Sequence, residues 1–389
     1  MKKKSLIYSL IAVLIGMSFA SASTPAYAAT PNDLVTKYRL ANVTGTKVNV
    51  LIVPGHDDEY SGTEFGDIRE SDVVVAIGQY LYDYLKADTR LNVRISRTQA
   101  GYTPAFKNYF ENNREEILQF ISTSRAAYKN KISSGQIKSV ESVPHNAAPD
   151  EVAIRLYGIN KWANENNVDI ILHLHVNDAG GRVWGQPGEY TGVSVYIPEG
   201  QFVHAPTSAV LGESMYSELI LKNKKSNYPP EANGLLEDQD LIAVGANGTL
   251  TNAAIALIEY GYIYEPQFTN LAIQETITQD FAHQTFLGLH RFFRDRELYA
   301  RSTPAAPRPT VASAVPTFKT DLELTMQNAD VSALQNVLTK EGVYSCEITG
   351  YYGPCTQSGV KALQKKYGIR QTGVVGPLTR AKLNSLFSR

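Results

Sequence analysis

Short apolar segments and amphipathic segments alternate along the first three quarters of the chain. The apolar segments, which are rich in β-branched and aliphatic residues, are residues 48–53, 91–96, 168–178, 193–197 and 254–258. Segments with apolar residues three or four positions apart are residues 71–87, 152–166, 208–222 and 271–296. The first set predicts strands and the second predicts helices. Strands that alternate with helices are typical of an α/β fold, so we expect a mixed, mostly parallel sheet sandwiched by helices.

Two segments depart from this alternation. Residues 29–47 are polar and are interpreted as a short lead-in. Residues 101–150 have helical periodicity from Phe106 to Ser122 and are polar from residue 123 onward. We interpret residues 101–150 as an inserted arm, part helix and part loop. Long insertions of this kind are usually functional, and we expect this one to border the active end of the sheet.

The composition changes near residue 300, which predicts a second domain. Residues 301–321 are a Pro/Ala-rich linker, with four prolines among small residues. Residues 322–389 contain three short helical patterns between glycine-rich turns, at Val331–Leu338, Gln357–Tyr367 and Leu378–Leu386. We therefore expect a large domain over residues 29–300 and a small all-α domain over residues 322–389, in line with a length of 389 residues.

The N-terminus has the pattern of an export signal. Lys2, Lys3 and Lys4 precede an apolar core, and Ala26-Tyr27-Ala28 is a small-x-small cleavage site. We predict a signal peptide over residues 1–28, since the apolar run is short for a membrane anchor. The protein is then exported, to a periplasm or to the extracellular cell envelope, with no membrane span in the mature chain.

The net charge and the two cysteines argue against two classes of protein: nucleic-acid-binding proteins and enzymes with a catalytic thiol. Removal of residues 1–28 takes away three lysines and no acid, which changes the formal net charge from −1 to −4. This balance argues against a nucleic-acid-binding protein, which usually carries a basic patch. The two cysteines, Cys346 and Cys355, are closely spaced. In an exported chain such a pair favours a disulfide over a catalytic thiol.

Several residues with catalytic chemistry follow directly on the predicted strands. His56 comes after Pro54-Gly55 at the end of the first strand, and Glu70 opens the helix that follows. His173 and His175 lie two apart and therefore share one face of a strand. Glu259 ends an almost purely apolar run. Because reacting groups collect at the carboxyl ends of strands in α/β sheets, these side chains can meet.

Two histidines and a glutamate satisfy the three-ligand rule for catalytic zinc, and a further carboxylate can act as general base. We favour His56, Glu70 and His175 as Zn²⁺ ligands and Glu259 as the base. Alternatives stay open: Glu59 or Glu64 in place of Glu70, and Glu265 in place of Glu259. His173 would ligate instead of His175 or act beside it, and His145 would be an extra ligand if it is not a solvated loop residue.

The same residues carry a resemblance to a known family. Val-Pro-Gly-His56, Arg-Glu70-Ser-Asp, His-Leu-His175-Val-Asn and Ile-Glu259-Tyr-Gly-Tyr-Ile occur in this order. Over roughly residues 48–296 the chain resembles the zinc-dependent N-acetylmuramoyl-L-alanine amidases of the Amidase_3 type. The resemblance implies that His56, Glu70 and His175 bind zinc and that Glu259 is the catalytic acid/base. It further implies cleavage of the amide between N-acetylmuramic acid and L-alanine in peptidoglycan.

The motifs also depart from the family pattern. Val53 stands where an Asp usually precedes Pro-Gly-His, and Asp57-Asp58 replaces the usual Gly-Gly. His173 occupies the position of a small Ser, and Tyr262 that of a Phe. Two other functions therefore remain: another zinc-dependent amide or peptide hydrolase of the cell wall, or a catalytically inactive wall-binding protein.

The tail is similar to the three-helix type of peptidoglycan-binding domain. The pattern is carried by Leu334-Gln335, Gly350-Tyr-Tyr-Gly353, Leu363-Gln364, Tyr367-Gly368 and Leu383-Asn384. These residues are mostly core and turn formers, so they identify a fold more than a binding site. The resemblance implies that peptidoglycan is both the substrate of the large domain and the target of the tail.

Overall fold

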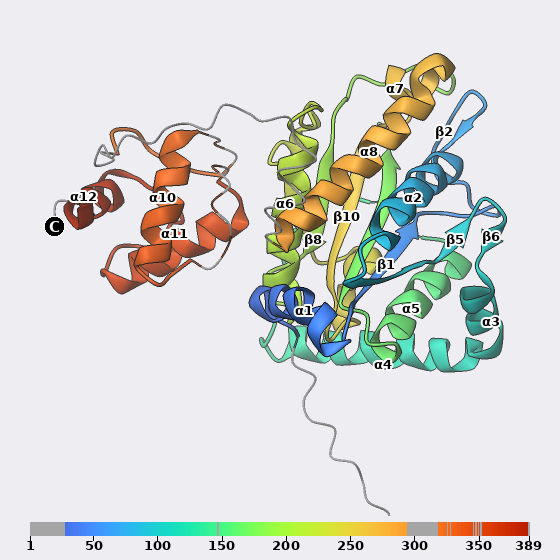
Figure 1. The fold of residues 1–389 in the computed structure, drawn as a ribbon, viewed down its shortest axis with the longest axis horizontal. Helices are drawn as coiled ribbons and strands as arrows, with labels where there is room; N and C mark the ends of the chain where they lie inside the picture. Colours follow the sequence, from blue (N-terminus) through green and yellow to red (C-terminus); the bar gives the residue numbers. More distant parts are fainter. Residues whose placement is uncertain are drawn as a thin grey trace, which may run out of the picture.

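The computed structural model describes residues 28–145, 148–293, 318–324, 326, 328–344, 346, 348, 350 and 352–387. The predicted signal peptide, apart from Ala28, lies outside these residues, and so does the predicted linker up to residue 317. Over the described part the chain forms a large α/β unit and a small helical unit (Figure 1). No helix among the described residues is both long and apolar enough to cross a membrane.

A six-stranded sheet forms the centre of the large unit. Its spatial order is β4 (Leu91–Ile95), β1 (Val48–Pro54), β7 (Ile170–Asn177), β10 (Ala254–Tyr262), β8 (Ser194–Pro198) and β9 (Leu235–Asp238). Neighbouring strands are parallel except for β8 and β10, which are antiparallel. The mixed, mostly parallel sheet is therefore confirmed. Strand β9 was not predicted, since four residues give little periodicity.

Helices cover both faces of this sheet. One face packs on α2 (Glu70–Lys86), α6 (Ala205–Leu219) and α8 (Leu271–Phe292), and the other on α5 (Asp150–Glu165) (Figure 1). Successive residues of β1 alternate between these layers: Ile52 packs in the first core, and Leu51 and Val53 pack in the second. Because side chains of a strand alternate, odd-numbered residues of β7 and β10 face the α5 layer.

The predicted lead-in is wrong, because residues 31–44 form helix α1 (Pro31–Thr44). Thr30 caps the helix: its hydroxyl accepts from the Asp33 backbone N–H at 3.2 Å, and the Asp33 side chain accepts from the Thr30 backbone N–H at 2.9 Å. Pro31 fits the first turn, where no N–H is needed. Tyr38 is buried and donates its hydroxyl hydrogen to Asp88 at 2.6 Å. The helix is thus held by tertiary contacts that its sequence pattern did not indicate.

The inserted arm differs from the single short helix expected at residues 106–122. It begins with α3 (Pro104–Asn112) and continues as α4 (Arg114–Ser133), separated by Asn113 with φ −117° and ψ 20°. The polar stretch after residue 122 is therefore helical up to Ser133. Residues 137–145 then run without regular structure. The short hairpin strands β2 (Glu64–Phe65), β3 (Ile68–Arg69), β5 (Arg97–Thr98) and β6 (Gly101–Tyr102) flank the site described below.

The small unit contains the three predicted helices, α10 (Ala329–Lys340), α11 (Pro354–Lys366) and α12 (Pro377–Phe387). Its own core includes Leu334, Leu338 and Leu363. Cys346 and Cys355 form a disulfide, as predicted. Helix α11 lies against α6 of the large unit: a Cβ at Gly353 would be 3.0 Å from the Cδ of Glu213. This contact is on the side of the sheet away from α5.

Candidate metal centre

His56 is presented just beyond the carboxyl end of β1. Gly55 extends the strand pairing by donating its N–H to the Leu174 carbonyl at 2.9 Å. His56 then adopts a left-handed backbone with φ 59°. This conformation costs about 1–2 kcal/mol for a residue with a side chain. Backbone strain of this kind is concentrated at functional sites, where the surrounding structure holds it in place.

Glu70 is the first residue of α2, and its carboxylate is buried. Two backbone N–H groups donate to it, that of Thr63 at 3.0 Å and that of Val176 at 3.1 Å. Two imidazoles approach the same carboxylate. Nε2 of His56 is 3.1 Å from Oε2, and Nδ1 of His175 is 2.9 Å from Oε1. The Glu70 carboxylate thereby connects the loop segments of His56 and Thr63 to the end of β7.

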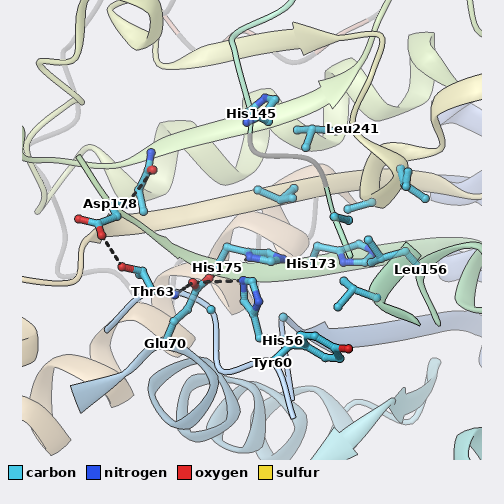
Figure 2. Close-up of a pocket in the computed structure, with 18 of the residues that line it drawn as sticks. His56, Tyr60, Thr63, Glu70, His145, Leu156, His173, His175, Asp178 and Leu241 are labelled. Carbon is cyan, nitrogen blue, oxygen red and sulfur yellow. Dashed lines mark hydrogen bonds and ion pairs between the residues drawn. The ribbon is translucent and has the colours of Figure 1, made fainter. Parts of the chain in front are cut away.

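His175 and His173 lie on the α5 face of β7, as their spacing predicted. Only His175 joins His56 and Glu70: one ligand atom from each of the three residues lies within 4.8 Å of the others. His173 lies one pleat further back, with its ring centroid 6.4 Å from that of His175 (Figure 2). Both ring nitrogens of His173 are buried, with no hydrogen-bond partner among the described residues.

The pKa shifts of Glu70 and His175, but not that of His56, favour the forms that bind a cation. Burial alone would raise the pKa of Glu70, but His56 and His175 hold that pKa well below its usual range. Burial lowers the pKa of His175, although Glu70 opposes the effect. Burial also favours the neutral form of His56, yet the nearby Glu70 charge raises its pKa overall. A carboxylate and a neutral imidazole are the forms that bind metals.

The donor set fits zinc. Imidazole nitrogens and a carboxylate oxygen are common zinc ligands, and three protein ligands leave a position for water or substrate in catalytic sites. Nε2 of His175 is buried and has no hydrogen-bond partner among the described residues, which is costly unless something binds there. His56, Glu70 and His175 are therefore the residues that could hold the ion.

Glu259 lies next to this cluster, on the neighbouring strand. The residue pairs with His175 in the parallel ladder between β10 and β7, so both side chains project from the same face of the sheet. Its Oε2 is buried, with no hydrogen-bond partner in the described part of the chain. Burial raises the pKa of Glu259 well above its ordinary value, and the charges of Glu70 and Glu231 raise it further. A carboxyl group with a raised pKa is a stronger base than an ordinary glutamate, which suits a role in proton transfer.

Two residues that support the site were not predicted. Buried Arg97 donates to the carbonyls of Pro54 at 3.2 Å, Gly55 at 2.7 Å and Ser71 at 2.7 Å. It thereby ties the end of β1 to the start of α2. Arg97 could have been found from the sequence, because it directly follows the predicted strand 91–96 and parallel neighbouring strands end at the same edge of a sheet.

Glu231 is the second of these residues and is also buried. Its carboxylate accepts hydrogen bonds from Asn177 at 2.7 Å, Tyr196 at 2.6 Å, Ser226 at 2.6 Å and Tyr262 at 3.0 Å. The hydroxyl of Tyr262, which departs from the family's Phe, is thus explained by this contact. Glu231 is the last residue of a single 3-10 turn, Pro229–Glu231, and no periodicity or motif in the sequence marks it.

The alternative site residues lie elsewhere. Glu59 is exposed and binds Arg155 at 2.5 Å, and Glu64 accepts from the Ser61 hydroxyl at 2.6 Å. Glu265 accepts from the backbone N–H groups of Gly192 and Tyr262 at 3.0 and 2.8 Å. His145 is an exposed loop residue, as expected. It contacts the buried Asp238 carboxylate at 3.0 Å, away from the metal cluster.

A cleft of about 1530 Å³ opens over the cluster. Its floor includes His56, His175 and Glu259, and the arm contributes to one wall through Ser142 and His145. Figure 2 shows Asp178 on one side of His175 and Leu156 of α5 on the other. The cleft is large enough for an extended substrate that contacts both sides of the cluster.

Comparisons with known proteins agree with the resemblance described above. Residues 50–291 match the family model described as N-acetylmuramoyl-L-alanine amidase. Residues 327–383 match the model described as a putative peptidoglycan binding domain. No curated protein sequence gives a significant match.

Three solved amidase structures are similar to about two thirds of this chain. The CwlD amidase of Clostridioides difficile, solved in complex with the GerS lipoprotein, is 13% identical with a TM-score of 0.42; the match spans 64% of this chain and all of that one. An N-acetylmuramoyl-L-alanine amidase of Clostridium difficile 630 is 18% identical, with a TM-score of 0.40 and coverage of 64% and 98%. The amidase Ami1 of Mycobacterium smegmatis is 14% identical, with a TM-score of 0.40 and coverage of 64% and 97%.

Proposed function

The chain belongs to the N-acetylmuramoyl-L-alanine amidase family over residues 50–291, and from this premise we propose a reaction and a metal. The reaction is hydrolysis of the amide between the lactyl group of N-acetylmuramic acid and the L-alanine of the stem peptide. The metal is Zn²⁺, held by His56, Glu70 and His175. The observation that carries the proposal is the convergence of these three side chains within 4.8 Å on the cleft floor, beside Glu259.

Each residue of the site has a distinct task. Bound zinc would polarise the lactyl carbonyl and lower the pKa of a coordinated water. Glu259 takes a proton from the attacking water and returns it to the departing alanine nitrogen, so one carboxyl group serves as base and then as acid. Its raised pKa makes Glu259 a stronger base than an ordinary glutamate. Glu70 orients both imidazoles, while Arg97 fixes the loops that carry His56 and Glu70.

We also propose the division of the chain into functional parts. Residues 1–28 would be a signal peptide that directs export, residues 29–300 the catalytic domain and residues 301–321 the linker. Residues 322–389 would hold the enzyme on peptidoglycan, which the match of residues 327–383 to a peptidoglycan-binding domain supports. Export is consistent with a substrate that lies outside the cytoplasm.

Digestion of purified peptidoglycan tests the reaction. The amidase reaction releases free L-alanine N-termini and creates no new sugar reducing ends. New N-termini on residues other than L-alanine would instead indicate a stem-peptide peptidase. Absence of any product from metal-loaded protein would indicate an inactive wall-binding protein.

Metal analysis of variants tests the ligands. We expect about one zinc per chain, with His56→Ala and His175→Ala each losing the metal because three protein ligands are needed. His173→Ala is the matched control and should keep most of the metal, since its ring lies a pleat behind. Full zinc content in His175→Ala together with loss in His173→Ala would reverse the assignment.

A further inference from the structure

Resting on the proposed function, we infer that Trp184 is the platform for the N-acetylmuramic acid ring and therefore sets the direction of the substrate in the cleft. The sugar lies on the loop between β7 and β8, and the stem peptide extends across the metal cluster toward α5. The inference comes from an exposed indole on a firmly anchored turn at one end of the cleft.

The turn presents Trp184 to solvent. Gly181 with φ 78° and Gly185 with φ 75° bound it, and left-handed backbone is accessible to glycine without strain. Gln186 donates its N–H to the Val183 carbonyl at 3.0 Å, which closes the turn. Trp184 lines the cleft and is 72% exposed. In contrast, Trp162, the other tryptophan of the chain, lies in the core and is 6% exposed. Ligand-binding clefts are commonly lined by aromatic side chains, and Trp184 is placed to make such a contact.

Arg182 anchors this turn. Its guanidinium donates to both carboxylate oxygens of Asp178, at 2.7 and 2.8 Å, and to the Glu64 carbonyl at 2.8 Å. It also lies over the ring of Phe65, 5.5 Å from the centroid. Such a bidentate arginine–carboxylate pair fixes geometry as well as adding energy. Trp184 is therefore presented by a preorganised turn, so binding a ligand there has a small ordering cost.

The turn is also fixed relative to the metal cluster. The Thr63 hydroxyl donates to Asp178 at 2.7 Å, and the Thr63 backbone N–H donates to Glu70 at 3.0 Å (Figure 2). One short chain of contacts thus runs from a proposed zinc ligand to the turn that carries Trp184. A substrate that contacts both groups would be held in one register.

The two ends of the cleft differ in chemistry, and so do the sugar and the stem peptide of the substrate. The negative face of an indole attracts the slightly positive C–H groups on the face of a sugar ring, and their contact buries apolar surface. On the α5 side the lining combines apolar side chains such as Leu156 with charged residues that include Arg125, Asp150, Arg155 and Asp240. These groups match a stem peptide, which carries ionised groups, better than an uncharged sugar ring.

A pair of substrates isolates the contribution of the sugar. N-acetylmuramoyl-tripeptide contains the ring, and D-lactoyl-tripeptide contains the same scissile amide without it. We expect Trp184→Ala to lower kcat/KM on the first substrate about tenfold, the equivalent of 1.4 kcal/mol, and to leave the second unchanged. Val183→Ala is the matched control: it removes an exposed apolar side chain from the same turn, outside the cleft lining, and should change neither value.

Equal losses by Trp184→Ala on both substrates, or no loss on either, would overturn the inference. A second measurement does not depend on turnover: titration of the full-length protein with N-acetylmuramic acid, observed through the two indole N–H signals by NMR. We expect a saturable shift of the exposed Trp184 signal, with buried Trp162 as the internal reference. If the wild type cleaves neither substrate, the proposed function fails, and absence of the Trp184 shift would independently overturn the inference.

Discussion

At the residue scale, Gly55 shows how closely the backbone approaches His175, a proposed metal ligand. A Cβ at this position would lie 2.3–2.7 Å from three atoms of the His175 ring. We predict that Gly55→Ala displaces that imidazole and lowers zinc affinity about 10–100-fold, the range found when the support of a ligand is disturbed. Competition with a chelator measures the affinity.

Gly180→Ala is the control for this substitution, because no heavy atom lies within 4 Å of the Cβ that it would add. It should bind zinc as the wild type does, and circular dichroism should show both variants folded. Unchanged zinc affinity in Gly55→Ala would mean that His175 is not a ligand in the position described.

Glu259 gives a prediction about turnover without metal loss. Glu259→Gln keeps the size of the side chain and removes its proton affinity, so zinc should remain bound. Turnover should fall by about 10²–10⁴-fold, the usual contribution of a general acid–base group. Glu265→Gln should keep most of its turnover, since that carboxylate serves two backbone N–H groups. The reverse pattern would transfer the role of base to Glu265.

The raised pKa of Glu259 also predicts a pH dependence. A general base must be deprotonated, so kcat/KM should rise with pH through an acid limb whose midpoint lies above the ordinary glutamate value. Below that midpoint the carboxyl group is protonated, as burial and the charges of Glu70 and Glu231 favour, and activity is lost. The residual rate of Glu259→Gln should lack this limb, and a limb that persists in the variant would assign it to another group.

Some residues of the site could be identified from the sequence, and others could not. His56, Glu70, His175 and Glu259 could be predicted because each stands at the end of a periodic segment, where α/β sheets concentrate chemistry. Glu231 could not, because its four donors come from segments far apart in the chain. Trp184 was equally hidden, since exposure at a cleft depends on the fold around the turn.

At the element scale, periodicity identified the long elements and failed on the short or capped ones. The strands around the site and helices α2, α5, α6 and α8 follow the predicted order, with ends shifted by a few residues. Helix α1 was missed because it has a weak apolar stripe, although Thr30 and Asp33 form a capping pair that could have indicated its start. Asn113 splits the arm helix through its backbone conformation, which apolar spacing does not encode.

The arm segment of residues 137–145 crosses the end of the sheet and is held there by Gln239. The Gln239 side chain accepts from the Val140 N–H at 3.0 Å and donates to the Lys138 carbonyl at 3.0 Å. We predict that Gln239→Ala lowers the free energy of opening this segment by about 1–2 kcal/mol, since two hydrogen bonds to the segment, each contributing about 0.5–1.5 kcal/mol, are lost. Amide hydrogen exchange at Val140 should then become roughly tenfold faster.

Gln119→Ala on α4 is the control for the arm, since the exposed Gln119 side chain donates to the Thr123 hydroxyl of the same helix. Its exchange at Val140 should match that of the wild type. Unchanged exchange in Gln239→Ala would mean that the segment is held mainly by its other contacts, such as that between His145 and Asp238.

At the scale of the whole molecule, the small unit contacts α6 on the sheet side away from α5 and the cleft. We predict that deletion of residues 319–389 slows digestion of intact sacculi, because tethering raises the local substrate concentration and can add about 10²–10⁴-fold to apparent binding. Cleavage of a soluble muropeptide should change less than twofold, since zinc and Glu259 remain. Parallel assays on the two substrates measure the difference, and equal losses would mean that the tail shapes the cleft.

The position of Thr63 can make zinc binding differ between the enzyme bound to peptidoglycan and the free enzyme. Its backbone N–H donates to the carboxylate of Glu70, and its hydroxyl donates to Asp178, which anchors the turn that bears Trp184. Thr63 therefore contributes to both the proposed zinc site and the proposed sugar site. Thermodynamic reciprocity then requires that if zinc strengthens sugar binding by some factor, the sugar strengthens zinc binding by the same factor. With a factor above one, an amidase of this design would retain its metal most firmly while bound to the glycan, and where zinc is scarce the fraction of enzyme that holds zinc would rise with the amount of cell wall.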